Sequence, residues 1–250
     1  MQQQQQQQQQ AEDTTSTKIQ TVTLCNPGNP TGVSLSKTKV LERASELCKQ
    51  YGAWLILDCT YEHFEHTSTD NSMFTTCIDH EPHVLHVFSF SKGYAMAGFR
   101  CGYLTTTSEH VYNQMLKVQD SIPICPSRVS QIAALGALQT QRQWVNEKVA
   151  TLDTGRRAIL DALDPLDVVM GGTGAMYLMA KLPATSSDDR EVARMLVEKY
   201  GVAVIPGSFC GFPGWIRVCY SNLPPETCIE AAERLGNGIR SICSDSQQET

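Results

Sequence analysis

The chain has 250 residues, of which 41% are hydrophobic and 18% charged, and its formal net charge is −6 at pH 7. This composition allows a sizeable core in one or two domains, and the negative charge argues against a general nucleic-acid-binding protein. No stretch approaches the ~18 consecutive apolar residues of a membrane span, and no secretory signal is seen, so we expect a cytoplasmic protein without membrane contacts. The ten cysteines form no Cys-x-x-Cys pair and the histidines are scattered, which predicts reduced thiols and no metal site.

The first half of the chain predicts a mainly parallel sheet. Residues 1–17, nine glutamines followed by a polar stretch, have no apolar periodicity and predict a disordered tail. Strands are expected over 21–25, 54–57, 84–88 and 101–104, and a long connection over 62–82. Ser36 can cap a helix whose apolar positions run from Val40 to Cys48 and that ends at Gly52. This order is typical of an open α/β sheet, in which ligands collect beyond the carboxyl ends of the strands.

The second half predicts helices and then a small α+β unit. Residues 109–118 and most of 127–163 have helical periodicity, and we place the domain boundary near Thr151. Strands are expected over 168–170, 175–182, 202–205 and 215–219, and helices over 188–200 and 224–242. Glycines at 171, 172 and 174 favour a hairpin turn over a phosphate loop, because neither a lysine nor a helix follows them.

Three polar motifs follow apolar runs in the first half. They read N-P-G-N-P-T-G over 26–32, D-C-T-Y over 58–61 and S-F-S-K-G-Y-A-M-A-G-F-R over 89–100. A single lysine is most often a solvated surface charge. Lys92, however, lies just past a buried strand, near small residues and an arginine, and two other polar strand ends precede it. This setting favours a Schiff-base nucleophile.

With these motifs in this order, the sequence resembles the fold-type I, pyridoxal-phosphate-dependent aminotransferases of classes I and II. Residues 117–125 and 174–183 are similar to plant-type aromatic aminotransferases that use methionine as donor, and the resemblance covers about 18–242. It implies an α/β fold, the remnant of a three-layer, mainly parallel sheet domain over 18–150. A small α+β C-terminal domain over 151–243 and a tail over 244–250 would follow.

The resemblance also implies a function. It would be transamination between an α-amino acid, possibly aromatic, and a 2-oxo acid through a Lys92 Schiff base, with pyridoxal 5′-phosphate as cofactor and a homodimer as the assembly. Complete family members have a long portion before the first motif that is not seen in this sequence. The alternative is therefore a truncated, catalytically inactive fragment that acts, if at all, by association. A third reading is a lyase or synthase with the same cofactor.

The resemblance assigns four residues to the reacting end of the cofactor. Lys92 would form the Schiff base and carry the proton, and Asp58 would pair with the pyridinium nitrogen. Asn29 and Tyr61 would hydrogen-bond the phenolic oxygen. Taken alone, Asp58 and Asn29 are typical turn residues, and Tyr61 is equally typical of a packed aromatic.

Three further residues would bind anions. Ser89 and Arg100 would hold the cofactor phosphate, and Arg100 follows Lys92 by eight positions (100 − 92), which is the family spacing. Arg217 lies within the alternating strand 215–219, where the family uses an arginine to bind the substrate carboxylate. Without the resemblance, a structural salt bridge would be the preferred interpretation of Arg217.

Overall fold

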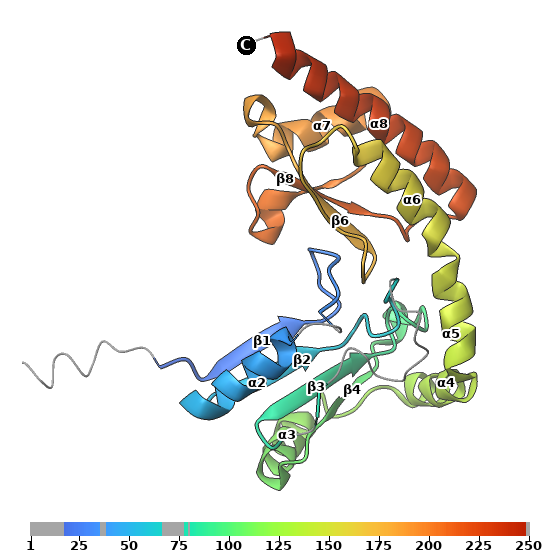
Figure 1. The fold of residues 1–250 in the computed structure, drawn as a ribbon. Helices are drawn as coiled ribbons and strands as arrows, with labels where there is room; N and C mark the ends of the chain where they lie inside the picture. Colours follow the sequence, from blue (N-terminus) through green and yellow to red (C-terminus); the bar gives the residue numbers. More distant parts are fainter. Residues whose placement is uncertain (1–17, 36–38, 67–77, 80, 249–250) are drawn as a thin grey trace, which may run out of the picture.

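The computed structural model describes residues 18–35, 39–66, 78–79 and 81–248, without the side chains of 245–248. Two sheets, each with its own helices, lie one above the other in the view of Figure 1, and a run of helices joins them along one side. The predicted disordered tail over 1–17, the predicted cap Ser36 and most of the predicted connection over 62–82 lie outside the described residues.

The lower sheet has the order β1-β2-β3-β4. Its strands are β1 (Thr21–Cys25), β2 (Trp54–Asp58), β3 (Val84–Ser89) and β4 (Gly102–Thr105). The first three are parallel and β4 is antiparallel to β3. Helix α2 (Val40–Tyr51) packs Leu41 and Cys48 against the buried Leu55 and Leu57 of β2. Apolar residues at helical spacing, together with the left-handed Gly52 cap, explain its position and its end.

Residues 127–163, predicted to be helical over most of their length, form three helices after α3 (Glu109–Ser121). They are α4 (Arg128–Gln139), α5 (Gln141–Ala150) and α6 (Leu152–Leu163). The breaks fall at Thr140 and Thr151. Their hydroxyls donate to the carbonyls of Ala137 and Lys148, each at 2.7 Å. A threonine hydroxyl that bonds to the preceding turn competes with the helical backbone, so the chain bends where the apolar periodicity continues.

The small unit has an antiparallel sheet of order β5-β6-β8-β7. Its strands are β5 (Val169–Gly171), β6 (Tyr177–Lys181), β7 (Ile205–Pro206) and β8 (Trp215–Cys219), and its helices are α7 (Asp189–Tyr200) and α8 (Pro225–Gln248). The 171–174 turn joins β5 to β6 as a hairpin, as predicted. The predicted strand over 202–205 is reduced to β7, and α8 continues through residues predicted to be a tail.

A mainly parallel sheet followed by a small α+β unit confirms the predicted fold class. The largest buried cluster lies in the small unit, and Tyr61 and Phe64 of the lower unit pack into it. Within the described residues, no helix combines the length and hydrophobicity needed to cross a bilayer.

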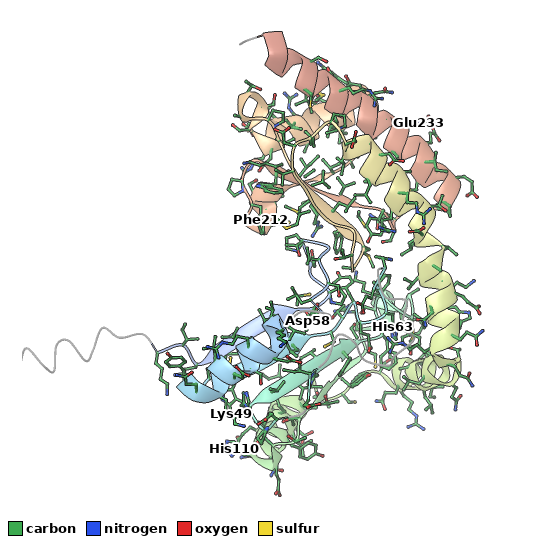
Figure 2. The ribbon with its side chains drawn as sticks, in the orientation of Figure 1. Lys49, Asp58, His63, His110, Phe212 and Glu233 are labelled. Atoms are coloured by element: carbon green, nitrogen blue, oxygen red, sulfur yellow. The ribbon has the colours of Figure 1, made fainter. Side chains whose placement is uncertain are left out.

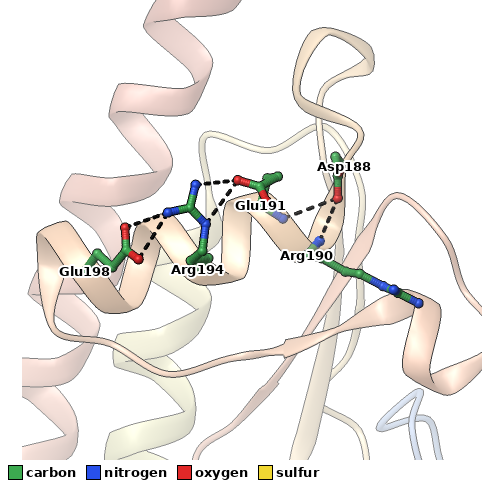
Figure 3. Close-up of polar contacts among 5 residues, drawn as sticks. All are labelled: Asp188, Arg190, Glu191, Arg194 and Glu198. Carbon is green, nitrogen blue, oxygen red and sulfur yellow. Dashed lines mark hydrogen bonds and ion pairs between the residues drawn. The ribbon is translucent and has the colours of Figure 1, made fainter.

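Helix α7 has a charged outer face, shown in Figure 3. The Asp188 carboxylate accepts hydrogen bonds from the backbone N–H groups of Arg190 and Glu191 at 3.1 and 3.2 Å. Arg194 pairs with both Glu191 and Glu198. Exposed pairs of this kind orient side chains and stabilise a fold only weakly.

Candidate active site

The predicted site residues gather at one edge of the lower sheet. Asp58 pairs with Cys25 of β1 on one side and with Val87 of β3 on the other. Hydrogen bonds continue past the strand ends, from the Asn26 N–H to the Asp58 carbonyl at 3.0 Å and from the Cys59 N–H to the Val87 carbonyl at 2.8 Å. The carboxyl ends of three parallel strands therefore lie side by side, at the edge where α/β sheets bind ligands. Figure 2 shows Asp58 and His63 at the end of this sheet that faces the small unit.

Lys92 lies in a tight turn that begins where β3 ends. The Ser89 hydroxyl accepts from the Ser91 N–H at 3.1 Å, and the Ala95 N–H donates to the Lys92 carbonyl at 3.0 Å. Backbone and side-chain bonds thus fix this turn on both sides of the lysine. Lys92 itself is half-buried, and its side chain makes no hydrogen bond or ion pair with any other described residue.

Arg100 is brought to the same edge by the antiparallel return of the chain. Ser89 pairs with Gly102, and the Phe90 N–H donates to the Cys101 carbonyl at 3.2 Å, so Arg100 lies beside the start of the lysine turn. It has a left-handed backbone conformation (φ 53°) and is exposed, and its guanidinium donates to the Ala97 carbonyl at 3.0 Å. Arg100 therefore ends a short 3-10 helix and also places a positive charge at the sheet edge.

The Asp58 carboxylate is oriented by a neighbour two residues along the chain. One oxygen accepts from the Thr60 N–H at 3.0 Å and from the Thr60 hydroxyl at 2.6 Å. Asp58 is half-buried. These bonds leave its second carboxylate oxygen available for another donor.

Tyr61 is buried, and its hydroxyl lies 2.9 Å from the hydroxyl of Tyr177 in β6. The two rings meet edge to face, with centroids 5.7 Å apart. Burial raises the pKa of Tyr61 well above its usual range, and the Arg217 charge opposes this shift. Tyr61 is therefore a neutral hydroxyl at physiological pH.

Arg217 reaches across from the small unit to Asn29. Its Nη1 donates to Asn29 Oδ1 at 3.0 Å, and its guanidinium carbon lies 4.7 Å from the centre of the Tyr177 ring. Its Nε is buried and has no hydrogen-bond partner among the described residues. The arginine is supported on two sides and keeps unused donors, which suits an anion.

The predicted site residues thus fall into two groups. Asp58, Ser89, Lys92 and Arg100 share the sheet edge through strand pairing, whereas direct contacts join Asn29, Tyr61 and Arg217. Tyr177, which connects the second group, was missed by the sequence analysis. Residues 177–180 form a continuous apolar run that predicts a buried strand, but nothing in the sequence pairs this strand with 215–219. Among the described residues, no cluster of histidine, cysteine or carboxylate side chains could hold a metal ion.

Comparisons with known proteins agree with this architecture. A sequence model of the class I and II aminotransferases matches residues 2–235. The chain is 40% identical over 225 residues to the aromatic aminotransferase ISS1 of Arabidopsis thaliana, covering 88% of this chain and 56% of that protein. It is 29% identical over 228 residues to an aspartate aminotransferase of Thermotoga maritima, covering 90% and 57%.

Solved structures of aminotransferases have the same fold. The aromatic aminotransferase of Pyrococcus horikoshii superposes with a TM-score of 0.79 at 26% identity, covering 92% of this chain and 62% of that one. The aspartate aminotransferase of Thermotoga maritima gives a TM-score of 0.76 at 26% identity, covering 93% and 60%. The chain spans less than two thirds of the length of these relatives. The matched family model covers most of the sequence, and the chain belongs to the class I and II aminotransferase family.

Proposed function

We propose that the chain binds pyridoxal 5′-phosphate through Lys92 and supports transamination between an α-amino acid and a 2-oxo acid. The observation that carries this proposal is the strand register that gathers Asp58, Ser89, Lys92 and Arg100 at one sheet edge. The family is pyridoxal-phosphate-dependent, and such a cofactor supplies an aldehyde and a ring that accepts electrons from the substrate.

The side chains at the edge fit the chemical groups of this cofactor. Arg100 and the Ser89 hydroxyl are suited to a phosphate, and the free Asp58 oxygen is suited to a protonated ring nitrogen. Tyr61 is a neutral hydroxyl that can donate to a phenolic oxygen. Lys92 has no competing ion pair among the described residues, so its amine is available to an aldehyde.

The Lys92 amine would hold the cofactor covalently, since a bound cofactor would supply an aldehyde whose oxygen leaves as water when an amine adds to it. With substrate bound, the free Lys92 amine would carry a proton from the substrate α-carbon. Arg217, supported by Asn29 and Tyr177, would hold the substrate carboxylate, and the aromatic relatives favour an aromatic amino acid as one substrate.

Borohydride trapping tests this proposal. Purified chain mixed with pyridoxal 5′-phosphate and reduced should carry a stable label on the peptide containing Lys92, found by mass spectrometry. Lys92→Ala should lose that label and the Schiff-base absorbance. The matched control is Lys49→Ala, which removes a lysine paired with Glu81 on the exposed face of α2.

Labels spread evenly over surface lysines, or unchanged labelling of Lys92→Ala, would refute Lys92 as the reactive amine. Labelling at Lys92 without exchange of amino groups, when an aromatic amino acid and a 2-oxo acid are both supplied, would favour the inactive fragment. Turnover without a 2-oxo acid would indicate a lyase or synthase.

We also propose two domains that divide near Thr151, over 18–150 and 151–243, and a homodimer as the functional assembly. Helices α5 and α6 meet at this threonine, and the two sheets fall on either side of it. Limited proteolysis and the mass in solution test these two proposals.

A further inference from the structure

We propose that Tyr177 is a positioning residue that holds Arg217 with its ring and Tyr61 with its hydroxyl. The inference rests on the proposed function, in which those two residues face the substrate carboxylate and the cofactor. Tyr177 would thereby join the substrate-binding and cofactor-binding halves of the site through one rigid side chain.

Strand pairing explains how the Tyr177 ring reaches Arg217. Strands β6 and β8 are antiparallel, with Tyr177 opposite Cys219 and Met179 opposite Arg217. Tyr177 and Arg217 are therefore diagonal neighbours on the same face of the sheet. The ring is buried, and the guanidinium carbon lies 4.7 Å from its centre, within the range of a cation–π interaction.

The other end of Tyr177 contacts Tyr61. Only one of two hydroxyls 2.9 Å apart can donate to the other. The Arg217 cation over the Tyr177 ring withdraws electron density from it, which makes the Tyr177 hydroxyl the better donor. Tyr177 then donates and the Tyr61 oxygen accepts, so the Tyr61 proton remains free to point to a second acceptor. Hydrogen bonds in such a chain strengthen one another.

The two contacts can be removed one at a time. Tyr177→Phe keeps the ring under Arg217 and removes only the hydroxyl. Tyr177→Leu removes both contacts at a similar degree of burial. A purely structural role for Tyr177 would weaken the two ends of the site together, whereas a positioning role predicts that they separate.

The first measurement is the affinity of 3-phenylpropionate, a carboxylate with an aromatic group and no amine, by calorimetry. Tyr177→Phe should bind this probe within about twofold of the unmodified chain, whereas Tyr177→Leu should bind it about 5- to 30-fold more weakly, the range between an exposed and a desolvated cation–π contact. In an Arg217→Met background, Tyr177→Leu should have no further effect. Tyr112→Leu, on the exposed face of α3, is the matched control.

The second measurement is the pH midpoint of the Schiff-base absorbance. Tyr177→Phe should shift it in the same direction as Tyr61→Phe and by a smaller amount, because Tyr61 remains but is less well oriented. Circular dichroism and thermal unfolding of each variant show whether it is folded. If Tyr177→Leu does not fold, the Phe variant together with Arg217→Met still provides both comparisons.

Failure of this inference can be distinguished from failure of the proposed function. If the chain binds probe and cofactor but Tyr177→Leu behaves as the unmodified chain, Tyr177 is not a positioning residue. A Tyr177→Leu effect that persists undiminished in the Arg217→Met background would also overturn the inference. If no label forms at Lys92 while the probe result holds, the proposed function fails and the support of Arg217 by Tyr177 stands.

Discussion

Two buried titratable residues, Glu62 and His63, lie next to the turn that holds Lys92. Glu62 Oε1 is 3.5 Å from His63 Nε2, and both residues are buried. Burial raises the pKa of Glu62 to about 7, which the Arg142 charge opposes. Burial, aided by Arg142, lowers the pKa of His63 to about 4. Tyr94 completes the cluster, with its ring 5.4 Å from that of His63.

These opposite shifts predict an unusual pH dependence of stability. At about pH 5.5 the folded pair is a neutral carboxyl and a neutral imidazole, whereas the unfolded chain has a carboxylate and an imidazolium. Both states bind one proton, so the two contributions to the slope of stability against pH cancel between about pH 4.5 and 6.5. We expect this pair to leave the stability of the unmodified chain nearly independent of pH in that window.

Variants that remove one residue of the pair should reveal the pH dependence of stability that the other residue contributes. In Glu62→Gln only His63 titrates. Because its pKa is lower in the folded chain, the unfolded chain binds more protons, and the free energy of unfolding should rise with pH from about 4 to 6.5. In His63→Asn only Glu62 titrates. Because its pKa is higher in the folded chain, the folded chain binds more protons, and the free energy of unfolding should fall as pH rises from about 4.5 to 7. Each change should be on the order of 3 kcal/mol, measured by urea unfolding across the range. Parallel profiles for both variants and the unmodified chain would contradict this cancellation.

Gly93 is a second residue whose identity follows from this cluster. A Cβ at this position would lie 2.3 Å from His63 Cδ2, and the buried imidazole has little room to move. Gly93→Ala should therefore destabilise the chain by about 1–3 kcal/mol, as overpacking does, and weaken cofactor binding by displacing the lysine turn. Thermal unfolding and cofactor titration measure both effects.

A second substitution provides the internal check on Gly93. His63→Ala should cost less stability in the Gly93→Ala background than in the unmodified chain, because it removes the clashing ring. Gly98→Ala is the matched control, since nothing lies within 4 Å of its added Cβ. Strictly additive effects of Gly93→Ala and His63→Ala would show that the clash is relieved elsewhere.

At the scale of elements, Asp189 ties the start of α7 to two other segments. Its carboxylate accepts from the N–H groups of Ser208 and Gly214, both at 2.9 Å, and from the Ser208 hydroxyl at 2.7 Å. Asp189→Asn would bring a donor against these donors in a buried place, so we expect a loss of about 2–4 kcal/mol in urea unfolding. The exposed neighbour Asp188 is the control, because asparagine caps a helix as well as aspartate, and Asp188→Asn should change stability by less than about 0.5 kcal/mol. Equal losses in the two variants would rule out the proposed role of Asp189.

Element prediction succeeded where side-chain periodicity alone decides the structure. Strands β1, β2, β3 and β8 and helices α2 and α7 lie where the apolar spacing predicted them. Periodicity did not locate the breaks within 127–163, at Thr140 and Thr151, where local hydrogen bonds compete with the helical backbone. The backbone at Gln141, with φ 67°, lies outside the helical region although the apolar pattern continues past it. Such a break depends on a hydrogen bond from a hydroxyl group, which the spacing of apolar side chains does not reveal.

At the scale of the whole molecule, the sequence analysis could find the ends of strands but not the contacts between units. The motifs placed Asp58, Ser89 and Lys92 at one sheet edge, and strand pairing agrees with that placement. Arg217 could be assigned only through the family resemblance, because its partner Asn29 is 188 residues away. Tyr177 could not be found at all, since its role depends on how β6 docks against Tyr61. Local patterns carry no information about that docking.

The docking itself rests on backbone hydrogen bonds around one hairpin. The N–H groups of Thr173 and Gly174 donate to the Gly32 carbonyl at 3.2 and 3.0 Å, and the Ala175 N–H donates to the Phe64 carbonyl at 2.8 Å. The 171–174 turn thus fits between the loop after β1 and the segment after β2. The same contacts bring Asn29 to Arg217 and Tyr61 to Tyr177, so formation of the site and docking of the units are one event.

Gly32 is the residue on which this docking depends most directly. Its φ is +67°, and an added Cβ would lie 1.8 Å from the Tyr177 carbonyl oxygen, a backbone atom that cannot move alone. Gly32→Ala should lower the free energy of unfolding by more than about 2 kcal/mol, combining left-handed strain with the clash. Hydrogen exchange should show the loss of protection at 173–175 before any loss in β2.

Gly136→Ala is the control for this variant, because nothing lies near its added Cβ on the open face of α4. This substitution should instead stabilise the chain by about 0.5–1 kcal/mol. Unchanged exchange at 173–175 in Gly32→Ala would mean that the units are held together by other contacts.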